Sequence, residues 1–167
     1  MTKLILVRHG ETIWNQERRY QGQEDSPLSS LGREQAQKTG KFLASQKIDA
    51  LYSSDLQRAA ETAEAIGRHH KLTAILKPQL REMSFGLWEG LTREEILSKY
   101  PKIYRARSLD NLNVRIPEGE LPHEVAERMK QAFKELLFKH KNQTIVVVAH
   151  GVCLRLAIAS FFQIPLT

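Results

Sequence analysis

LILVRHGETIWN, residues 4–15, and TIVVVAHGVCLR, residues 144–155, follow the same plan. Each opens with a short apolar run, which is typical of a strand buried in a sheet. Each run then leads into a histidine and a glycine, where a buried strand normally ends in a turn. Polar side chains are costly at the end of a core strand, so His9 and His150 indicate a functional site.

The rest of the chain alternates short apolar runs with helical patterns. Strands are expected at 4–7, 50–52, 74–76 and 144–148, and helices after Ser29, at 56–69, at 92–99, along the stripe Val125, Met129, Ala132 and Leu136, and at 152–162. This alternation predicts an α/β fold with three layers, α/β/α, around a mostly parallel central sheet. Ligands bind at the carboxyl ends of the strands in such sheets. The two histidines are therefore expected at one edge.

Composition narrows the class of protein. The 167 residues fit one domain with a single core. The net charge of +6 admits an anionic partner, but basic residues are scattered and aromatics make up only 7%, which argues against a nucleic-acid partner. A single cysteine, Cys153, fits a reducing compartment, and no apolar run approaches the roughly 20 residues of a membrane span. We expect a cytoplasmic protein without a membrane partner.

Charge at the strand ends identifies the ligand class. Arg8 precedes His9, and the second strand leads through SSDLQRAAETA, residues 53–63, to Arg58 in the first turn of a helix. The free N–H groups of a helix N-terminus favour anions, and arginine binds phosphate through paired donors. The glycines after the histidines would let the backbone approach a ligand or turn sharply. Together these features predict a phosphate pocket.

Histidine in such a pocket can act as a nucleophile. A neutral imidazole can form a covalent intermediate, and phosphoryl transfer needs an in-line nucleophile, positive charge and an acid for the leaving group. The spacing does not decide between Glu11, Glu82 and Glu89 as that acid. Zinc has no support, because no C-x-x-C or H-E-x-x-H pattern occurs. Cys153 is not expected to be the nucleophile of a cysteine phosphatase, because only one residue separates it from Arg155 and a loop that cradles phosphate needs more.

Five segments in order resemble the signature series of the histidine phosphatase superfamily, the branch with phosphoglycerate mutases, fructose-2,6-bisphosphatase and many small bacterial phosphatases. They are LVRHGETIWN, SSDLQRAAETA, REMSFGLWEGLT, PEGE and VVVAHGV, and they cover nearly the whole chain. The resemblance implies a phosphoglycerate mutase-like fold, no cofactor and no metal. It also implies a small phosphorylated metabolite as substrate, and a homodimer is compatible with it.

The resemblance assigns roles residue by residue. His9 matches the phosphorylated nucleophile, Arg8 and Arg58 match the arginines that clamp the phosphate, and Glu82 matches the proton donor. His150 matches the second histidine of the pocket, and Gly151 after it is expected to contact the substrate. Asn15, Gln21 and Gly22 match positions that contact phosphate or substrate.

The chain departs from the family in two places. Leu121 stands where many members have serine after GGE or EGE. The chain also stops at FFQIPLT, residues 161–167, where members continue with further segments. Residues 1–167 are therefore expected to form a single domain without the family's C-terminal segment.

Hydrolysis is the favoured reaction of this predicted domain. Mutases of the family carry a longer segment before the GE motif, whereas residues 89–117 are short here. The remaining alternatives are mutase-type transfer and a non-catalytic module that binds phosphate or nucleic acid. Plausible substrates of the family are α-ribazole phosphate, phosphoserine, phosphoglycerates and sugar phosphates. The segment 93–120 is expected to cover the pocket and to select among them.

Overall fold

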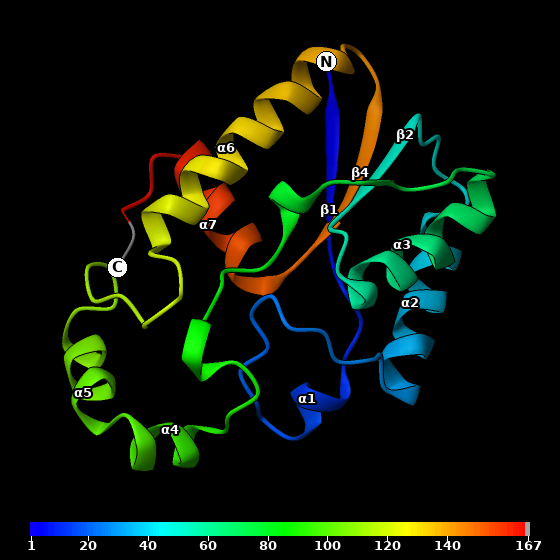
Figure 1. Cartoon of the computed structure of the whole chain (residues 1–167). Coiled ribbons are helices and arrows are strands. Elements are labelled where there is room, and N and C mark those ends of the chain that lie inside the picture. Colours follow the sequence, from blue (N-terminus) through cyan, green and yellow to red (C-terminus); the bar gives the residue numbers. More distant parts are fainter. Residues whose placement is uncertain (166–167) are drawn as a thin grey trace.

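The computed structural model describes residues 1–165, and Leu166 and Thr167 lie outside the described residues. Its central sheet has four parallel strands in the order β1-β4-β2-β3 (Figure 1). The strands are β1 (Lys3–Arg8), β2 (Ala50–Ser53), β3 (Ile75–Leu76) and β4 (Thr144–Ala149). The α/β class with a parallel sheet is therefore confirmed.

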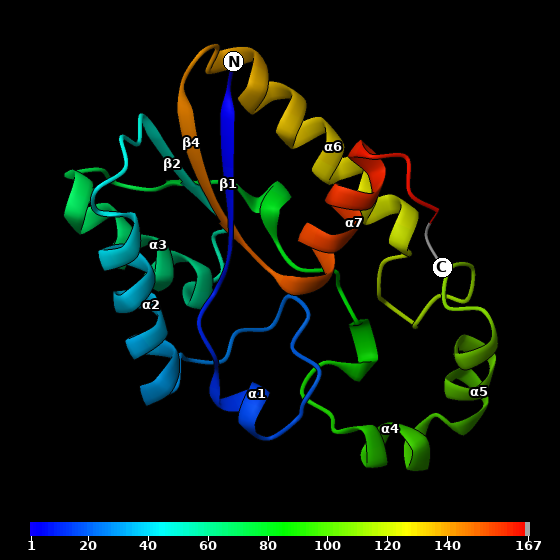
Figure 2. The same ribbon diagram turned by 180° about the vertical axis from the view of Figure 1, so that it is seen from behind.

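Helices cover both faces of the sheet (Figures 1 and 2). One layer consists of α2 (Ser30–Leu43) and α3 (Gln57–His70), and the other of α6 (Pro122–Lys139) and α7 (Gly151–Phe161). The short helix α1 (Ile13–Gln16) follows β1, and two 3₁₀ turns lie at Pro78–Leu80 and Gly86–Trp88. No helix among residues 1–165 combines the length and the apolar character needed to cross a membrane.

The apolar run of β4 explains the two layers. Successive side chains of a strand point to opposite faces of the sheet. Ile145 and Val147 accordingly pack with the core beneath α6 and α7, whereas Val146 and Val148 pack with the core beneath α2 and α3. All four are fully buried, as expected for a strand covered on both faces.

Strand register brings the histidines together. Arg8 of β1 lies opposite Ala149 of β4, so the next residues, His9 and His150, leave the sheet side by side. The main-chain N–H of His9 also donates to the carbonyl of Ala149 at 3.1 Å. The prediction that both histidines lie at one edge is confirmed.

Three expectations about the elements need correction. β1 is an edge strand of the described sheet and only half-buried, because β4 flanks it on one side alone. A helix, α5 (Pro101–Leu109), was not predicted, since it buries none of its residues and so has no apolar stripe. The final helix begins one residue earlier than predicted, at Gly151.

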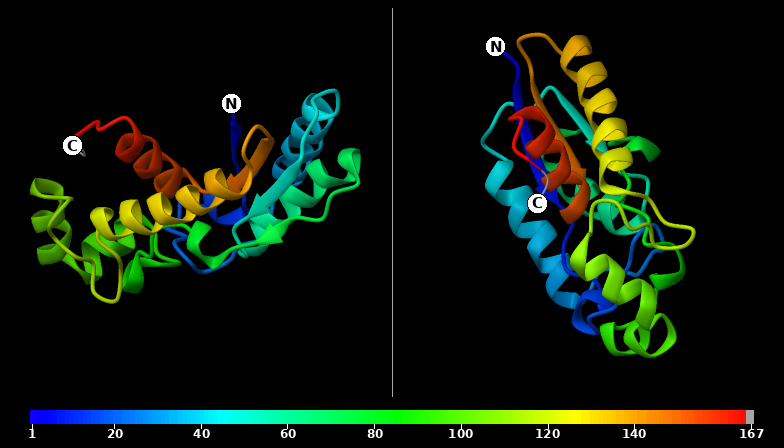
Figure 3. Two further views of the ribbon diagram at one scale, coloured as in Figure 1. Left: turned by 90° about the horizontal axis from the view of Figure 1, so that it is seen from above. Right: turned by 90° about the vertical axis from the view of Figure 1, so that its left-hand side faces the viewer.

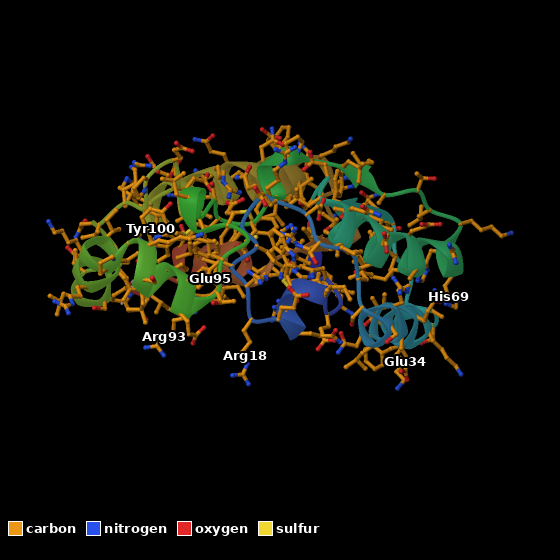
Figure 4. All side chains as sticks on the ribbon, turned by 60° about the horizontal axis from the view of Figure 1, so that its bottom comes forward. Arg18, Glu34, His69, Arg93, Glu95 and Tyr100 are labelled. Carbon is orange, nitrogen blue, oxygen red and sulfur yellow. The ribbon has the colours of Figure 1, made fainter. Side chains whose placement is uncertain are left out.

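A lobe lies beyond the carboxyl ends of the strands. It consists of α4 (Arg93–Lys99) and α5, and its small core contains Trp88, Ile96 and Ile116. The view from above shows α4 and α5 toward the same end of the molecule as α7 (Figure 3, left). Arg93 projects outward from this lobe, and Arg18 projects outward nearby (Figure 4). The lobe thus lies next to the carboxyl ends of the strands, on the side of the molecule where α7 lies.

Candidate active site

A cavity of about 280 Å³ lies at the carboxyl ends of the strands. Its lining comprises Arg8, His9, Asn15, Arg18, Arg19, Tyr20, Gln21, Gly22, Arg58, Glu82 and Phe85. We call it the histidine cavity. Seven of the nine predicted site residues line it, whereas the other two, His150 and Gly151, are not among the lining residues.

His9 is held in one tautomer. Its Nδ1 lies 2.7 Å from the carbonyl oxygen of Gly10, and because a carbonyl can only accept, the proton belongs on Nδ1. Nε2 then carries the free lone pair. Burial, together with the nearby cations Arg58 and Arg8, lowers the pKa of His9 to about 3. The ring is therefore a neutral base near pH 7, which is the state that a nucleophile requires.

His150 is completely buried beside His9. The two ring centroids are 5.0 Å apart, and neither nitrogen of His150 has a hydrogen-bond partner among the described residues. Burial, with the charge of Arg58 as a further cause, lowers the pKa of His150 well below its ordinary value. The second histidine is therefore also neutral, with donor and acceptor capacity left over beside the cavity.

Two arginines supply positive charge. Arg8 is exposed, lines the cavity and makes no ion pair within residues 1–165. Arg58 is 1% exposed and donates to the carbonyls of Gly22 at 2.7 Å and Glu24 at 2.8 Å and to the Asp25 carboxylate at 2.9 Å. A guanidinium has five N–H donors, so Arg58 retains two. The loop around residues 22–25 thus fixes Arg58 against the cavity.

The N-terminus of α3 differs from the prediction. Its cap residue is Leu56, whose side chain makes no capping hydrogen bond. Instead Asp25 accepts the main-chain N–H of Gln57 at 2.6 Å. This carboxylate already occupies the place where an anion was predicted to bind, so in this structure the positive charge of the cavity comes from side chains.

Thr12 orients two amide side chains of the cavity. Its main-chain N–H donates to Oδ1 of Asn15 at 3.1 Å, and its hydroxyl donates to Oε1 of Gln21 at 2.8 Å. With both amide oxygens engaged, the NH₂ groups of Asn15 and Gln21 remain as donors for an anion. Thr12 is completely buried, and sequence reasoning missed it. The T-x-x-N spacing that starts α1 was the only signal for it.

Glu82 joins the cavity to the start of α7. Oε1 accepts the main-chain N–H groups of Met83 at 2.8 Å and Cys153 at 2.9 Å, and Oε2 accepts that of Val152 at 3.0 Å. Each carboxyl oxygen has two lone-pair directions. Oε2 uses one of them, so Oε2 is the atom that can carry a proton toward the cavity.

Arg128 of α6 holds the backbone that presents Glu82. Its guanidinium donates to the carbonyls of Arg81 at 2.8 Å and Glu82 at 2.9 Å and pairs with Glu120 at 2.9 Å. Glu120 also accepts the main-chain N–H of Ser84 at 2.8 Å. The PEGE segment therefore contributes by fixing the loop that carries Glu82.

The other two candidate acids have different places. Glu11 accepts from the hydroxyl of Ser29 at 2.7 Å and does not line the histidine cavity. Glu89 also lies outside that lining, and its carboxylate accepts the main-chain N–H groups of Gln23, Glu24 and Phe85 at 2.7–3.1 Å. Glu89 thus fastens the loop that holds Arg58 to the loop that carries Glu82.

The two glycines after the histidines differ in whether packing requires them. A Cβ on Gly10 would overlap the main chain of Gly32 in α2, so Gly10 permits a close approach of backbone to helix. A Cβ on Gly151 would make an ordinary contact with Arg8 and needs no glycine. Gly22 has φ +57°, and a side chain there would overlap Glu89. Gly10 is therefore required by the packing of the backbone against α2, and not, as expected from the sequence, by the approach of a ligand.

Cys153 has no sign of reactivity. It is fully buried, and burial raises the pKa of its thiol to about 12, so the weakly nucleophilic thiol form prevails. It packs in the core beneath α6 and α7 as a small apolar residue. The part of the chain that the structure describes contains no group of three or more His, Cys, Asp or Glu side chains placed to hold a metal ion.

Comparison with known proteins agrees with this geometry. Phosphoserine phosphatase 1 of Hydrogenobacter thermophilus is 36% identical over 167 residues, which are all of this chain and 79% of that protein. A probable phosphoglycerate mutase GpmB of Erwinia tasmaniensis is 37% identical, over 99% of this chain and 77% of its own. The solved structure of Bacillus stearothermophilus YhfR superposes with a TM-score of 0.93 at 37% identity, covering 99% of this chain and 82% of that one.

A parallel sheet that presents two neighbouring histidines and two arginines at one edge defines a class of protein that handles phosphoryl groups. The family model of the histidine phosphatase superfamily, branch 1, matches residues 4–167. The chain belongs to this superfamily.

Proposed function

We propose that the protein is a metal-independent phosphomonoesterase that hydrolyses a small phosphorylated metabolite through a phosphohistidine at His9. One observation carries the proposal. The hydrogen bond from His9 Nδ1 to the Gly10 carbonyl leaves a neutral ring with its Nε2 lone pair free, in a cavity that also contains Arg8, Arg58 and Glu82. A neutral nucleophile, positive charge and a carboxyl group are the parts that phosphoryl transfer needs.

The reaction proceeds in two steps. In the first, His9 Nε2 forms a bond to phosphorus as the ester P–O bond breaks, and Glu82 gives its proton to the departing oxygen. In the second, Glu82 takes a proton from water, whose oxygen attacks phosphorus, and the N–P bond breaks. The products are the alcohol and inorganic phosphate, and His9 and Glu82 return to their starting states.

Other side chains of the site stabilise the charge of the transferring group. The guanidinium groups of Arg8 and Arg58 supply positive charge to its oxygens, and the NH₂ groups of Asn15 and Gln21 add neutral donors. His150 lies beside His9 and donates from its ring to the same group. Gly22 shapes the loop that holds Arg58, and Gly151 begins the helix that binds Glu82.

The substrate belongs to the class of small phosphomonoesters, which includes α-ribazole phosphate, phosphoserine, phosphoglycerates and sugar phosphates. The similarity to a phosphoserine phosphatase supports a hydrolase, whereas the similarity to a probable phosphoglycerate mutase supports transfer to a second alcohol. The short segment between Glu89 and Pro117 favours hydrolysis.

Rapid quench with a ³²P-labelled phosphomonoester tests the proposal. The wild type should form an acid-labile, base-stable phosphoprotein and release one inorganic phosphate per ester consumed. His9→Ala should form none and lose several orders of magnitude in turnover. Near-normal turnover in His9→Ala would overturn the mechanism, and phosphate recovered on a second alcohol would make the protein a mutase.

A further inference from the structure

A second hollow adjoins the histidine cavity. It has a volume of about 640 Å³, more than twice the 280 Å³ of the histidine cavity. Tyr20 and Phe85 line both, and their rings meet edge to face with centroids 5.2 Å apart. These two rings therefore form the boundary between the hollows. We call the larger one the apolar groove.

The walls of the apolar groove are mostly apolar and come from separate elements. Trp88 and Tyr104 belong to the lobe of α4 and α5, whereas Val152 and Leu156 belong to α7. The groove therefore lies where the lobe faces the final helix. The view from above shows these helices toward the same end of the molecule (Figure 3, left). Aromatic and aliphatic walls of this kind bind the apolar parts of small molecules.

Glu82 lies at the junction of the two hollows. It lines the histidine cavity, while its neighbour in sequence, Met83, lines the apolar groove. Oε2 of Glu82 also accepts the main-chain N–H of Val152, which lines the groove as well. An acid delivers its proton to the leaving oxygen, so the alcohol part of a substrate has to lie next to Glu82. The apolar groove is the hollow beyond that point.

Charge along the groove is of one sign. Its charged lining residues within 1–165 are Arg107 and Arg155, and no Asp or Glu lines it. Arg107 donates to the carbonyl of Val114, whereas Arg155 is exposed and makes no ion pair in the described part of the chain. A ligand with an ammonium group would find no carboxylate there to replace its hydration.

We propose that the apolar groove binds the alcohol part of the substrate and selects phosphomonoesters of bulky, apolar alcohols over those that carry an ammonium group, such as phosphoserine. This specificity rests on the proposed function, since it concerns the leaving group of that reaction. Burial of one methylene against such walls is worth about a fourfold change in affinity at most. The binding of several methylenes should therefore dominate the choice of substrate.

Hydrolysis of ethyl, butyl and hexyl phosphate and of phosphoserine tests this specificity. All four release a primary alcohol, so the chemistry of the leaving group stays similar. We expect kcat/KM to rise roughly two- to fourfold per methylene from ethyl to hexyl phosphate, and phosphoserine to fall below butyl phosphate. A flat series, or phosphoserine at or above butyl phosphate, would overturn the groove assignment and leave the phosphohistidine mechanism standing. If none of the four yields phosphate or phosphoprotein, both proposals fail.

Two variants of α5 separate the groove from general effects of charge. Ser108 and Ala106 are both exposed, but only Ser108 lines the groove. Ser108→Asp places a carboxylate in the groove and should lower the hexyl-to-ethyl ratio of kcat/KM at least threefold. Ala106→Asp adds the same charge outside and should leave that ratio unchanged. Equal ratios in the two variants would contradict binding of the alcohol in the groove.

Discussion

Glu82 and Cys153 are joined by a hydrogen bond of 2.9 Å, in which the main-chain N–H of Cys153 donates to Oε1. The proposed proton donor thus also supplies the N-terminal cap of α7, for which His150 offers no side-chain hydrogen bond. The Glu82 carboxyl group therefore serves both the proposed reaction and the stability of α7. A substitution at Glu82 therefore needs separate measurements of the two effects.

Glu82→Gln should slow phosphorylation of His9 by alkyl phosphates roughly 10²–10⁴-fold, the usual range for general acid catalysis. The loss should be much smaller with 4-nitrophenyl phosphate, because nitrophenolate departs without a proton. Single-turnover rates of phosphoprotein formation measure this step. Equal losses with both esters would show that Glu82 only positions other groups. The Tm of the variant, followed in parallel, reports the weakened cap of α7.

Acid should destabilise the fold through its neutral histidines. His9 and His150 have pKa values below the ordinary value of about 6.5, so the unfolded chain binds protons first as the pH falls. Their contribution to the free energy of unfolding is complete above pH ~6.5 and is lost as the pH falls below it; for His9 the loss continues down to its folded-state pKa of about 3. The slope is about 1.4 kcal/mol per pH unit for each histidine.

Urea unfolding between pH 7 and pH 4 measures this loss. His9→Gln removes one of the two groups, so its stability should fall less steeply with acid than that of the wild type. The difference in slope should approach 1.4 kcal/mol per pH unit, the value for one proton. Parallel curves for the two proteins would contradict the burial of a neutral His9.

Thr12→Val should impair the binding of phosphate. The variant loses the hydroxyl that orients Gln21 and leaves a buried amide oxygen without a donor, which costs about 1–3 kcal/mol of stability. We expect the inhibition constant of inorganic phosphate to rise severalfold. Thr12→Ser keeps the hydroxyl and should behave like the wild type. Equal inhibition constants in the valine and serine variants would exclude this role of Thr12.

Glu89→Gln should weaken the attachment between the loop that holds Arg58 and the loop that carries Glu82. An amide can replace only one carboxylate oxygen as acceptor, so some of the N–H groups from residues 23, 24 and 85 lose their partner. We expect a loss of about 1–3 kcal/mol in stability and a lower kcat. Glu64→Gln is the matched control, because Glu64 pairs only with Arg68 on the exposed face of α3 and should change stability by less than about 0.5 kcal/mol. Similar losses in both variants would refute the fastening of the loops by Glu89.

Chelation should leave activity intact. In the proposed mechanism the guanidinium groups of Arg8 and Arg58 take the part that a metal ion plays in other phosphatases. Phosphate release after dialysis against EDTA should equal that of the untreated protein. Loss of activity that a divalent cation restores would disprove metal independence.

Local patterns of residues account for most of the fold. The apolar runs of β1 and β4, the helical spacings and the order of strands and helices were enough to predict a parallel sheet. They also predicted that His9 and His150 lie together, because parallel strands end at the same edge. The helix α5 was not predicted because it has no buried face, and its apolar residues therefore do not recur at the spacing of a helix.

The sequence by itself determined the class of fold and the chemistry-bearing residue types at the strand ends, since both follow from short-range periodicity and strand direction. Only the tertiary structure decided which residues hold that chemistry in place. Thr12 binding Gln21, Asp25 binding Arg58 and Glu89 binding Phe85 are hydrogen bonds whose partners lie 9, 33 and 4 residues apart. In each pair at least one partner lies in a loop without periodicity. Such contacts depend on how the loops close over the sheet, and no local pattern encodes that closure.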